Sequence, residues 1–448
     1  MNLKLTMLLA ALAAASLAQA GVTPDEARQL GAALTAVGAE KSGNKDGTIP
    51  EFTGGTSIAA DAFKGGARPD PYADEKPRLI LTGKNSAGMD DKLTAGTREL
   101  LKRFPNFRVD VYPTHRPITL PKALLQNTAK NALQAKTTEG GVGVENALPG
   151  VPFPIPKSGF EVMWNHLLRY QGHALVTKFE SWNMDGAGVP SLASAGEFIQ
   201  EFPLGDPART AVAKQEDVFF RTKLSYTAPA RRAGESMMVF DAVNPLVQSR
   251  KAWQYLPGQR RVKLAPDLAY DTPNPAAAGN ATFDDAWVFN GALDRYDFKL
   301  VGKKEMIVPY IQYKQFAAKS ATDVLKPNHV NPDFVRWELH RVWVVEATLK
   351  PGKRHIYSKR TFYVDEDSWQ ALASDQYDGR GQLFRSTFGN LLYASDVQAT
   401  YSGSYVIYDF NSGAYNFTGL SKGQEVKYLP GLKPTQWSPD ALAGAGVR

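Results

Sequence analysis

The best candidates for proton transfer are Glu338 and His340, a carboxylate and an imidazole two positions apart in the sequence. Alternate residues of a β-strand project from the same face, so in a strand these two side chains, together with Glu346, lie side by side. Such a pair can transfer protons or bind a metal. On a solvated strand face it is more commonly a weak surface contact. A hydrolase acting through Glu338 and His340 is therefore the weakest of three functional hypotheses.

Other catalytic and metal-binding patterns are poorly supported. The chain has neither a Gly-x-Ser-x-Gly elbow nor a His-Glu-x-x-His motif. It has no cysteine, which excludes disulfides, thiol catalysis and thiolate metal sites. His166 and His173 are seven residues apart without a third ligand, and a calcium-loop-like stretch at 42–53 has Thr53 where the bidentate Glu belongs. We predict no catalytic residue, no metal ligand and no cofactor.

The pair lies in residues 336–388, which read as four consecutive antiparallel strands. In the first strand Trp337, Leu339, Trp343 and Val345 occupy alternate positions and predict a buried face. Turn-prone residues at 365–368 and 378–381 separate the later strands. This meander places Glu338 and His340 on the opposite face, where we expect them to be exposed.

Large aromatic side chains are the second candidate group, because they suit the wall of an apolar cavity. Each of them singly is more typical of a packed core. The nine candidates for ligand contact are Trp164, Trp253, Tyr255, Trp337, Trp343, Phe362, Trp369, Tyr377 and Phe384. A cavity of about 300 Å³ or more would favour a ligand carrier over a protein with a filled core.

The N-terminus predicts export. Residues 1–20 combine Lys4, an apolar run at 5–17 and the cleavage signal Ala18-Gln19-Ala20. We expect cleavage after Ala20, no lipid anchor because cysteine is absent, and a periplasmic location. The mature chain has no apolar run long enough to span a membrane. The full sequence has a net charge of +7 and contains no nucleic-acid-binding motif.

Two sections follow the signal. Residues 21–174 are rich in loops and helices, with helices expected at 95–103, at 122–134 and after the N-cap Ser158. Residues 175–448 predict about ten or eleven antiparallel strands. One of these, at 217–227, places Val218, Phe220, Leu224 and Tyr226 on one face. Residues 267–292, which include Asp284 and Asp285, read as a loop. We expect residues 21–448 to form one compact unit of the α+β class, dominated by strands.

Two stretches resemble a known fold family. Residues 253–266 (WQYLPGQRRVKLAP) and 359–385, with Tyr363, Asp365 and Gly381, are similar to the LolA/LolB carriers that sort outer-membrane lipoproteins in Gram-negative bacteria. GNKDGTIPEFTGG and VPFPIPKSGFEVMWNHLLRYQG resemble an exported proteobacterial family known as domain of unknown function 1329.

The resemblance implies an antiparallel open half-barrel packed on helices, with an apolar interior. It also implies a hydrophobic or lipid-like cargo, and partners such as an RND-type exporter and an outer-membrane protein. Our main hypothesis is therefore a periplasmic carrier or chaperone for a hydrophobic molecule. The alternative, from a different class, is a non-enzymatic docking partner of an envelope transporter.

Overall fold

Strands dominate the molecule, and the helices are short. The computed structural model describes residues 22–265, 268 and 270–445. The predicted signal at 1–20 lies outside the described residues. The helices are α2 (Pro24–Ala27), α3 (Ala95–Arg103), α4 (Lys122–Gln134), α5 (Gly159–Leu167), α6 (Tyr313–Ala317), α7 (Ala321–Val324) and α8 (Pro439–Ala445). No helix in the described part of the chain is long and apolar enough to cross a bilayer.

Most strands belong to one large sheet. They are β1 (Leu79–Thr82), β2 (Arg108–Val111), β5 (Ala174–Met184), β6 (Pro190–Glu201), β7 (Val218–Ala228), β8 (Ser236–Ala242), β9 (Lys251–Leu256), β10 (Arg261–Leu264), β11 (Tyr296–Pro309), β12 (Trp337–Leu349), β13 (Lys359–Asp365), β14 (Ala371–Tyr377), β15 (Leu383–Ala394), β16 (Ala399–Asp409), β17 (Tyr415–Leu420) and β18 (Lys427–Leu429). A separate small ribbon pairs β3 (Lys136–Thr138) with β4 (Gly143–Glu145).

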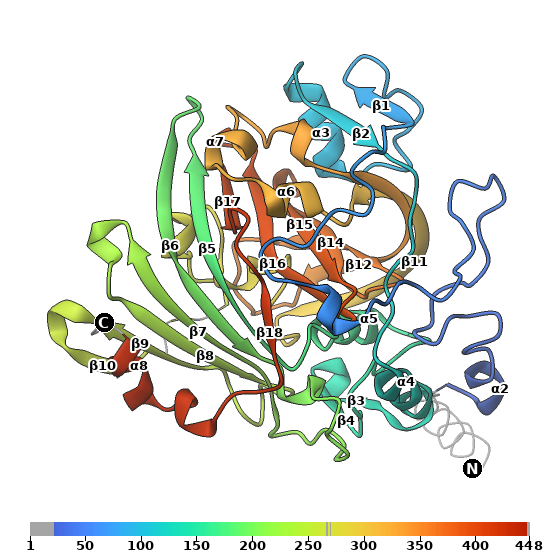
Figure 1. Cartoon of the computed structure of the whole chain (residues 1–448), viewed down its shortest axis with the longest axis horizontal. Coiled ribbons are helices and arrows are strands. Elements are labelled where there is room, and N and C mark those ends of the chain that lie inside the picture. The colour runs from blue at the N-terminus through green and yellow to red at the C-terminus, as the bar shows by residue number, and fades with distance from the viewer. Residues whose placement is uncertain (1–21, 266–267, 269, 446–448) are drawn as a thin grey trace, which may run out of the picture.

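The large sheet is open. Its sixteen strands run in the order β1-β2-β12-β13-β14-β15-β16-β17-β5-β6-β7-β8-β9-β10, with β11 beside β12 and β18 beside β5. Neighbours are antiparallel except for one parallel pairing between β2 and β12. In Figure 1 the sheet fans from β9 and β10 at the left to β11 and β12 at the right. The predicted class is confirmed: a strand-dominated α+β fold with a non-closed antiparallel sheet.

The predicted meander is present as β12 to β15. Each of its three hairpins has antiparallel register, as in the pairs Val345↔Phe362, Phe362↔Ser374 and Ser374↔Thr387. Helices α3 and α4 have the predicted bounds. Helix α5 starts after Ser158, whose side chain accepts a hydrogen bond from the Glu161 amide.

The β-region holds more strands than the sequence predicted, fourteen in the described residues from β5 to β18. Strand β6 has the sequence PSLASAGEFIQE, whose Pro, Ser and Gly content is unusual for a strand. Strand β11 is continuous over Tyr296–Pro309, with a register shift between Leu300 and Gly302. Pairing with β12 along the whole length of β11 holds it together across that irregularity.

Both faces of the meander are covered. On one face α5 packs against β11 and β12. On the other, residues of the N-terminal section pack against β12 to β15; for example, the Asp375 carboxylate accepts hydrogen bonds from the first amides of α3, Ala95 and Gly96, at 2.9 Å. Figure 1 shows this section, coloured blue to teal, along the upper and right-hand sides of the sheet. One cluster of buried apolar side chains extends from Val37 to Val426.

Candidate functional site

Glu338 and His340 are buried, with 0% and 1% of their surface exposed. The expectation that they face solvent is wrong, because the N-terminal section covers this face of β12. His340 Nε2 lies 3.0 Å from Glu338 Oε2, which also accepts a hydrogen bond from the His115 amide at 2.8 Å. The Arg336 guanidinium donates to Glu338 Oε1. Glu338 is therefore held by donors on both oxygens and closed to a substrate.

The nine predicted aromatics lie mainly in the packed interior. Trp164, Tyr255, Trp337, Phe362 and Trp369 are buried, and Trp253, Trp343, Tyr377 and Phe384 are half-buried. The Trp343 and Trp369 rings stack at 6.2 Å, and Trp369 donates to the Val37 carbonyl. Phe362 packs edge-on against Phe289 at 5.2 Å. None of the nine lines the cavity described next, so ligand contact by these residues stays a prediction.

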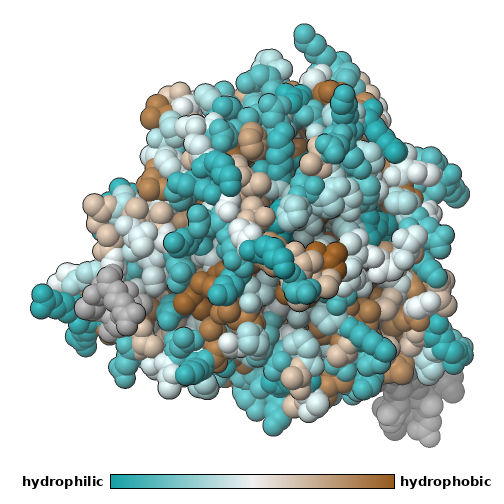
Figure 2. Space-filling model, in the orientation of Figure 1, coloured by the Kyte–Doolittle hydropathy of each residue, from teal (hydrophilic) through white to brown (hydrophobic). Residues whose placement is uncertain are grey.

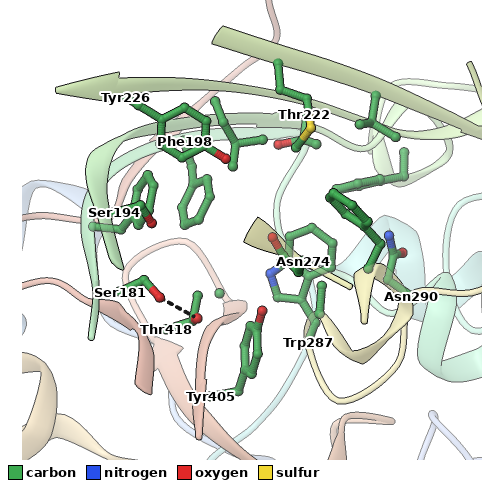
Figure 3. Close-up of a pocket in the computed structure, with 18 of the residues that line it drawn as sticks. Ser181, Ser194, Phe198, Thr222, Tyr226, Asn274, Trp287, Asn290, Tyr405 and Thr418 are labelled. Carbon is green, nitrogen blue, oxygen red and sulfur yellow. Dashed lines mark hydrogen bonds between the residues drawn. The ribbon is translucent and has the colours of Figure 1, made fainter. Parts of the chain in front are cut away.

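An apolar cavity, the inner cavity, lies against strands β5 to β8. It is lined by Phe179, Ser181, Ser194, Phe198, Phe220, Thr222, Leu224, Tyr226, Met237, Val239, Arg250, Asn274, Phe283, Ala286, Trp287, Asn290, Gly403, Tyr405 and Thr418. In Figure 3, Phe198 and Tyr226 lie on one side of the space, with Asn274 and Trp287 across from them and Tyr405 below. The free volume of the cavity is about 70 Å³.

Strand alternation builds the wall of this cavity. Phe179 and Phe198, on neighbouring strands, stack at 3.9 Å, and Phe198 is directly opposite Leu224 on β7. Three of the four side chains that alternation placed on one face of β7, Phe220, Leu224 and Tyr226, line the cavity together with Thr222. This alternation is the sequence signal that could have found the site, although none of these residues was among the nine predicted ligand contacts.

A loop closes the cavity. This inner segment (residues 270–293) contains the 3₁₀ helix Phe283–Asp285 and contributes Asn274, Phe283, Ala286, Trp287 and Asn290 to the lining. The sequence predicted residues 267–292 only as a loop. Its position against the sheet depends on contacts far along the chain.

Buried ion pairs fix the inner segment to the meander. Arg360, on β13, donates to Asp284 at 2.9 Å and to Asp285 at 2.8 Å, and all three side chains are buried. Burial alone would raise the pKa of Asp284, but the Arg360 guanidinium and His355 outweigh it and hold the pKa below its ordinary value. The segment is thereby anchored by charge beside an apolar space.

The anchored segment carries backbone strain where it meets the cavity. Trp287 and Val288 both have left-handed backbone angles, with φ of 55° and 72°. For a β-branched residue such as Val288 this region is a genuine outlier. Strain of this kind costs about 1–3 kcal/mol per residue and clusters at functional sites. Trp287 therefore combines a strained backbone with an aromatic side chain that lines the apolar cavity.

The polar groups of the cavity are mostly neutral. Ser181 and Thr418 share a hydrogen bond of 3.1 Å, whereas Thr222 Oγ1 is buried without a partner among the described residues. The charged lining residue, Arg250, donates to both oxygens of Asp241 at 2.7 and 2.8 Å. Burial lowers the pKa of Arg250, but the Asp241 carboxylate outweighs this effect and raises it. Apart from Arg250, the residues that line the cavity are apolar or uncharged.

A second hollow, the outer groove, lies beneath residues 56–72. It measures about 610 Å³, and its walls include Phe63, Tyr313 and Tyr393. They also include Lys64 and the buried ion pair of Arg68 with Asp396, at 2.8 Å. The groove is therefore larger than the inner cavity but carries more charge. On the face seen in Figure 2, apolar residues form scattered brown patches among hydrophilic ones.

Comparison with known proteins gives one family and several similar chains. Residues 80–443 match the family model described as "Protein of unknown function (DUF1329)". An uncharacterized protein of Pseudomonas aeruginosa is 41% identical over 437 residues, which cover 96% of this chain and 95% of that protein.

Solved structures with similar coordinates have low sequence identity. A putative outer membrane lipoprotein-sorting protein domain from Vibrio parahaemolyticus has a TM-score of 0.44 at 14% identity, covering 63% of this chain and 97% of that one. A DUF1329 family protein from Desulfovibrio piger has a TM-score of 0.41 at 16% identity, covering 60% and 92%. A LolA superfamily protein from Nitrosomonas europaea has a TM-score of 0.38 at 11% identity, covering 64% and 100%.

Proposed function

The chain belongs to the DUF1329 family, and we propose that it carries an apolar, lipid-like molecule in the inner cavity. The observation that carries the proposal is this cavity, lined by aromatic and aliphatic side chains of an open sheet and closed by the inner segment. Apolar walls with a few neutral polar groups are the usual form of a small-molecule site. Burying apolar ligand surface there contributes roughly 25 cal/mol per Å².

Loading requires the inner segment to move. The free space of about 70 Å³ is well below the size of an occupied pocket, so a ligand has to displace part of the wall. Trp287 and Val288 are the residues to move, because their strained backbone angles are relieved when they leave. The ion pairs of Arg360 keep the rest of the segment attached during that movement.

Cellular context is part of the proposal. The predicted signal at residues 1–20 supports a periplasmic location for the mature chain. An RND-type exporter and an outer-membrane protein are the partners that the sequence resemblance implies. Such partners would deliver or receive the cargo.

The second candidate function is a docking partner of an envelope transporter that carries no cargo. The small free volume of the inner cavity favours it, because a filled interior needs no ligand. The hydrolase hypothesis gains no such support, since Glu338 and His340 are enclosed by their own hydrogen-bond partners.

Binding of a neutral apolar fluorophore, N-phenylnaphthylamine, separates these candidates. We expect the mature chain to bind it, and the Val239→Phe variant to bind it at least tenfold more weakly, because the larger ring fills the inner cavity. Val189→Phe is the matched control, since Val189 is 58% exposed and does not line the cavity.

Three outcomes count against the carrier in the inner cavity. Absence of binding to the wild-type chain favours the docking partner. Equal binding by Val239→Phe and Val189→Phe removes the inner cavity from the account. Binding that survives Val239→Phe but is lost in Phe63→Ala assigns the fluorophore to the outer groove instead.

A further inference from the structure

His340 has one ring nitrogen that the hydrogen bonds of the site leave free. Its Nε2 faces Glu338 Oε2 at 3.0 Å, and Glu338 forms an ion pair with Arg336. A carboxylate can only accept, so we assign the proton of this bond to Nε2. Nδ1 then has a lone pair. The Tyr310 ring stacks on the imidazole at 3.6 Å and fixes its plane. The imidazole is therefore oriented with an acceptor pointing away from Glu338.

A buried carboxylate oxygen faces that acceptor. Asp365 Oδ1 lies 3.9 Å from His340 Nδ1. Asp365 Oδ2 accepts from Ser368 Oγ at 2.6 Å, from the Ser368 amide at 2.9 Å and from Tyr310 at 3.2 Å. Oδ1 has no hydrogen-bond partner among the described residues, and the side chain is 0% exposed. Two acceptors thus face each other in a dry interior, an arrangement that is unfavourable unless something positive lies between them.

A second carboxylate completes the group. Ligand atoms of His340, Asp365 and Asp367 all lie within 4.8 Å of one another. Asp367 accepts from Arg116 at 2.7 and 2.8 Å, one bond to each oxygen. Each carboxylate oxygen has two lone pairs, so Asp367 keeps a free one beside Arg116. Two atoms that each lie about 2.0–2.2 Å from the same ion are at most about 4.4 Å apart, which is within this limit of 4.8 Å.

Asp365 differs from the buried carboxylates around it. In the ion pairs of the described residues, Glu338 pairs with Arg336, Asp367 with Arg116, and Glu366 with Lys303 and Arg341. For Asp365 the corresponding partner is the imidazole of His340 alone. Each of the neighbouring carboxylates therefore has a Lys or Arg partner, whereas Asp365 has none, and no cation lies between Asp365 and His340 among the described residues.

We propose that His340, Asp365 and Asp367 bind a divalent transition-metal ion. One imidazole and two carboxylates suit Zn²⁺ or Mn²⁺. The hydrogen bond from His340 to Glu338 is the outer contact that usually accompanies a metal-bound histidine, because it fixes the tautomer and raises the basicity of the ligand nitrogen. This inference is independent of the cargo and of the inner cavity.

The location gives the ion a structural role. His340 belongs to β12, and Asp365 and Asp367 lie at and just after the end of β13. Arg116, which holds Asp367, also donates to the Glu40 carbonyl at 2.8 Å. The ion therefore lies where the N-terminal section packs on the meander, closed to solvent, as structural rather than catalytic metal sites are.

A proton is the competing occupant of the same position. Burial, and then the charge of Asp367, raises the pKa of Asp365, which favours a protonated carboxyl group. Metal analysis distinguishes the two. Mature protein purified without chelator should contain close to one equivalent of a transition metal by inductively coupled plasma mass spectrometry. After chelation it should rebind one equivalent of Zn²⁺ or Mn²⁺ in equilibrium dialysis.

Variants locate the ion. Asp365→Asn and His340→Gln should each weaken rebinding at least about 100-fold, whereas His355→Gln should retain it. His355 is the matched control, because it also contacts a buried carboxylate, Asp284, at 3.2 Å, which Arg360 already pairs. Thermal unfolding of the wild-type chain gives a second readout that requires no variant. The added ion should raise the midpoint, and chelator should reverse the increase.

Two results would overturn the metal site. One is a wild-type chain that contains no metal as purified and binds neither Zn²⁺ nor Mn²⁺ in dialysis. The other is rebinding that is unchanged in both folded variants. If the purified chain contains no metal and added Zn²⁺ or Mn²⁺ leaves its melting midpoint unchanged, the position between His340 and Asp365 is occupied by a proton on Asp365.

Discussion

The two halves of the large sheet, β12 to β16 and β5 to β10, differ in how deeply their side chains are buried. Strands β12 to β16 are buried on both faces, and nearly every residue of β14, β15 and β16 is inaccessible. Strands β5 to β9 mix buried positions with half-buried or exposed ones, and β10 has no buried residue. The two halves differ in the segment that covers them. Where the N-terminal section packs closely on the sheet, the aromatic side chains form a core; where the inner segment leaves space, they line a cavity.

The cover also decides the fate of polar residues. In the meander half, Glu338, His340, Asp365 and Asp375 are buried, and the N-terminal section supplies hydrogen-bond donors to Glu338 and Asp375. In the β5–β8 half, the inner segment leaves an unfilled apolar space and the unpartnered hydroxyl of Thr222. The meander half is filled, although buried polar atoms such as Asp365 Oδ1 and Ser374 Oγ have no partner there among the described residues. The hollow half is the one in which we propose that a ligand binds.

The largest expected effect tests the attachment between the two halves. Arg360→Met leaves Asp284 and Asp285 buried without their guanidinium, so we expect a loss of about 3–5 kcal/mol in the free energy of unfolding. Urea denaturation measures it. The matched control is Arg380→Met, because the Arg380 ion pair with Asp378 is on the surface and contributes less than about 1 kcal/mol. Equal losses in both variants would mean that charge does not hold the inner segment.

Two leucine substitutions compare the filled meander half with the hollow β5–β8 half. Leu372→Ala, in β14 at 0% exposure, creates a new void and should cost about 2–5 kcal/mol of unfolding free energy. Leu224→Ala only enlarges an existing cavity, so its cost should fall at or below the lower end of that range. Fluorophore binding should change in Leu224→Ala and not in Leu372→Ala. The reverse pattern would exchange the roles of the two halves.

The smallest effect concerns one hydroxyl. Thr222→Val removes an unpartnered buried polar atom and keeps the side-chain shape, so the chain should become more stable by up to about 1 kcal/mol. Thr387→Val is the control in the meander half. Its hydroxyl accepts from Gln376 at 2.7 Å, and its loss should destabilise. Stabilisation in both variants would contradict the distinction between unpaired and paired polar groups.

Local pattern predicted much of the fold. Helices α3 and α4 and the β12–β15 meander follow from periodicity and turn residues within the segments themselves. Strand β6 was missed because its Gly196 looks like a loop residue. In the sheet a Cβ at that position would lie 2.0 Å from the Ser225 carbonyl oxygen, so close strand packing requires glycine there.

The candidate sites depend on contacts that no local pattern contains. Arg360 and Asp285 are 75 residues apart, and Glu338 and His115 are 223 apart. In the sequence, Asp284 and Asp285 lie in a predicted loop, where the distance between side chains cannot be inferred. Glu338 was expected to be exposed to solvent. Alternation on β7 placed Phe220, Leu224 and Tyr226 on one face together with Val218, but none of them was a predicted ligand contact. The sequence could not place the inner segment opposite them, because long-range ion pairs do so.

The most direct test of the account is native mass spectrometry of the chain isolated from the periplasm of expressing cells, followed by organic extraction. The account predicts an apolar adduct on the wild-type chain and on Val189→Phe, and its loss from Val239→Phe. A wild-type chain without any adduct, or an adduct equally abundant on folded Val239→Phe, would contradict a cargo held in the inner cavity.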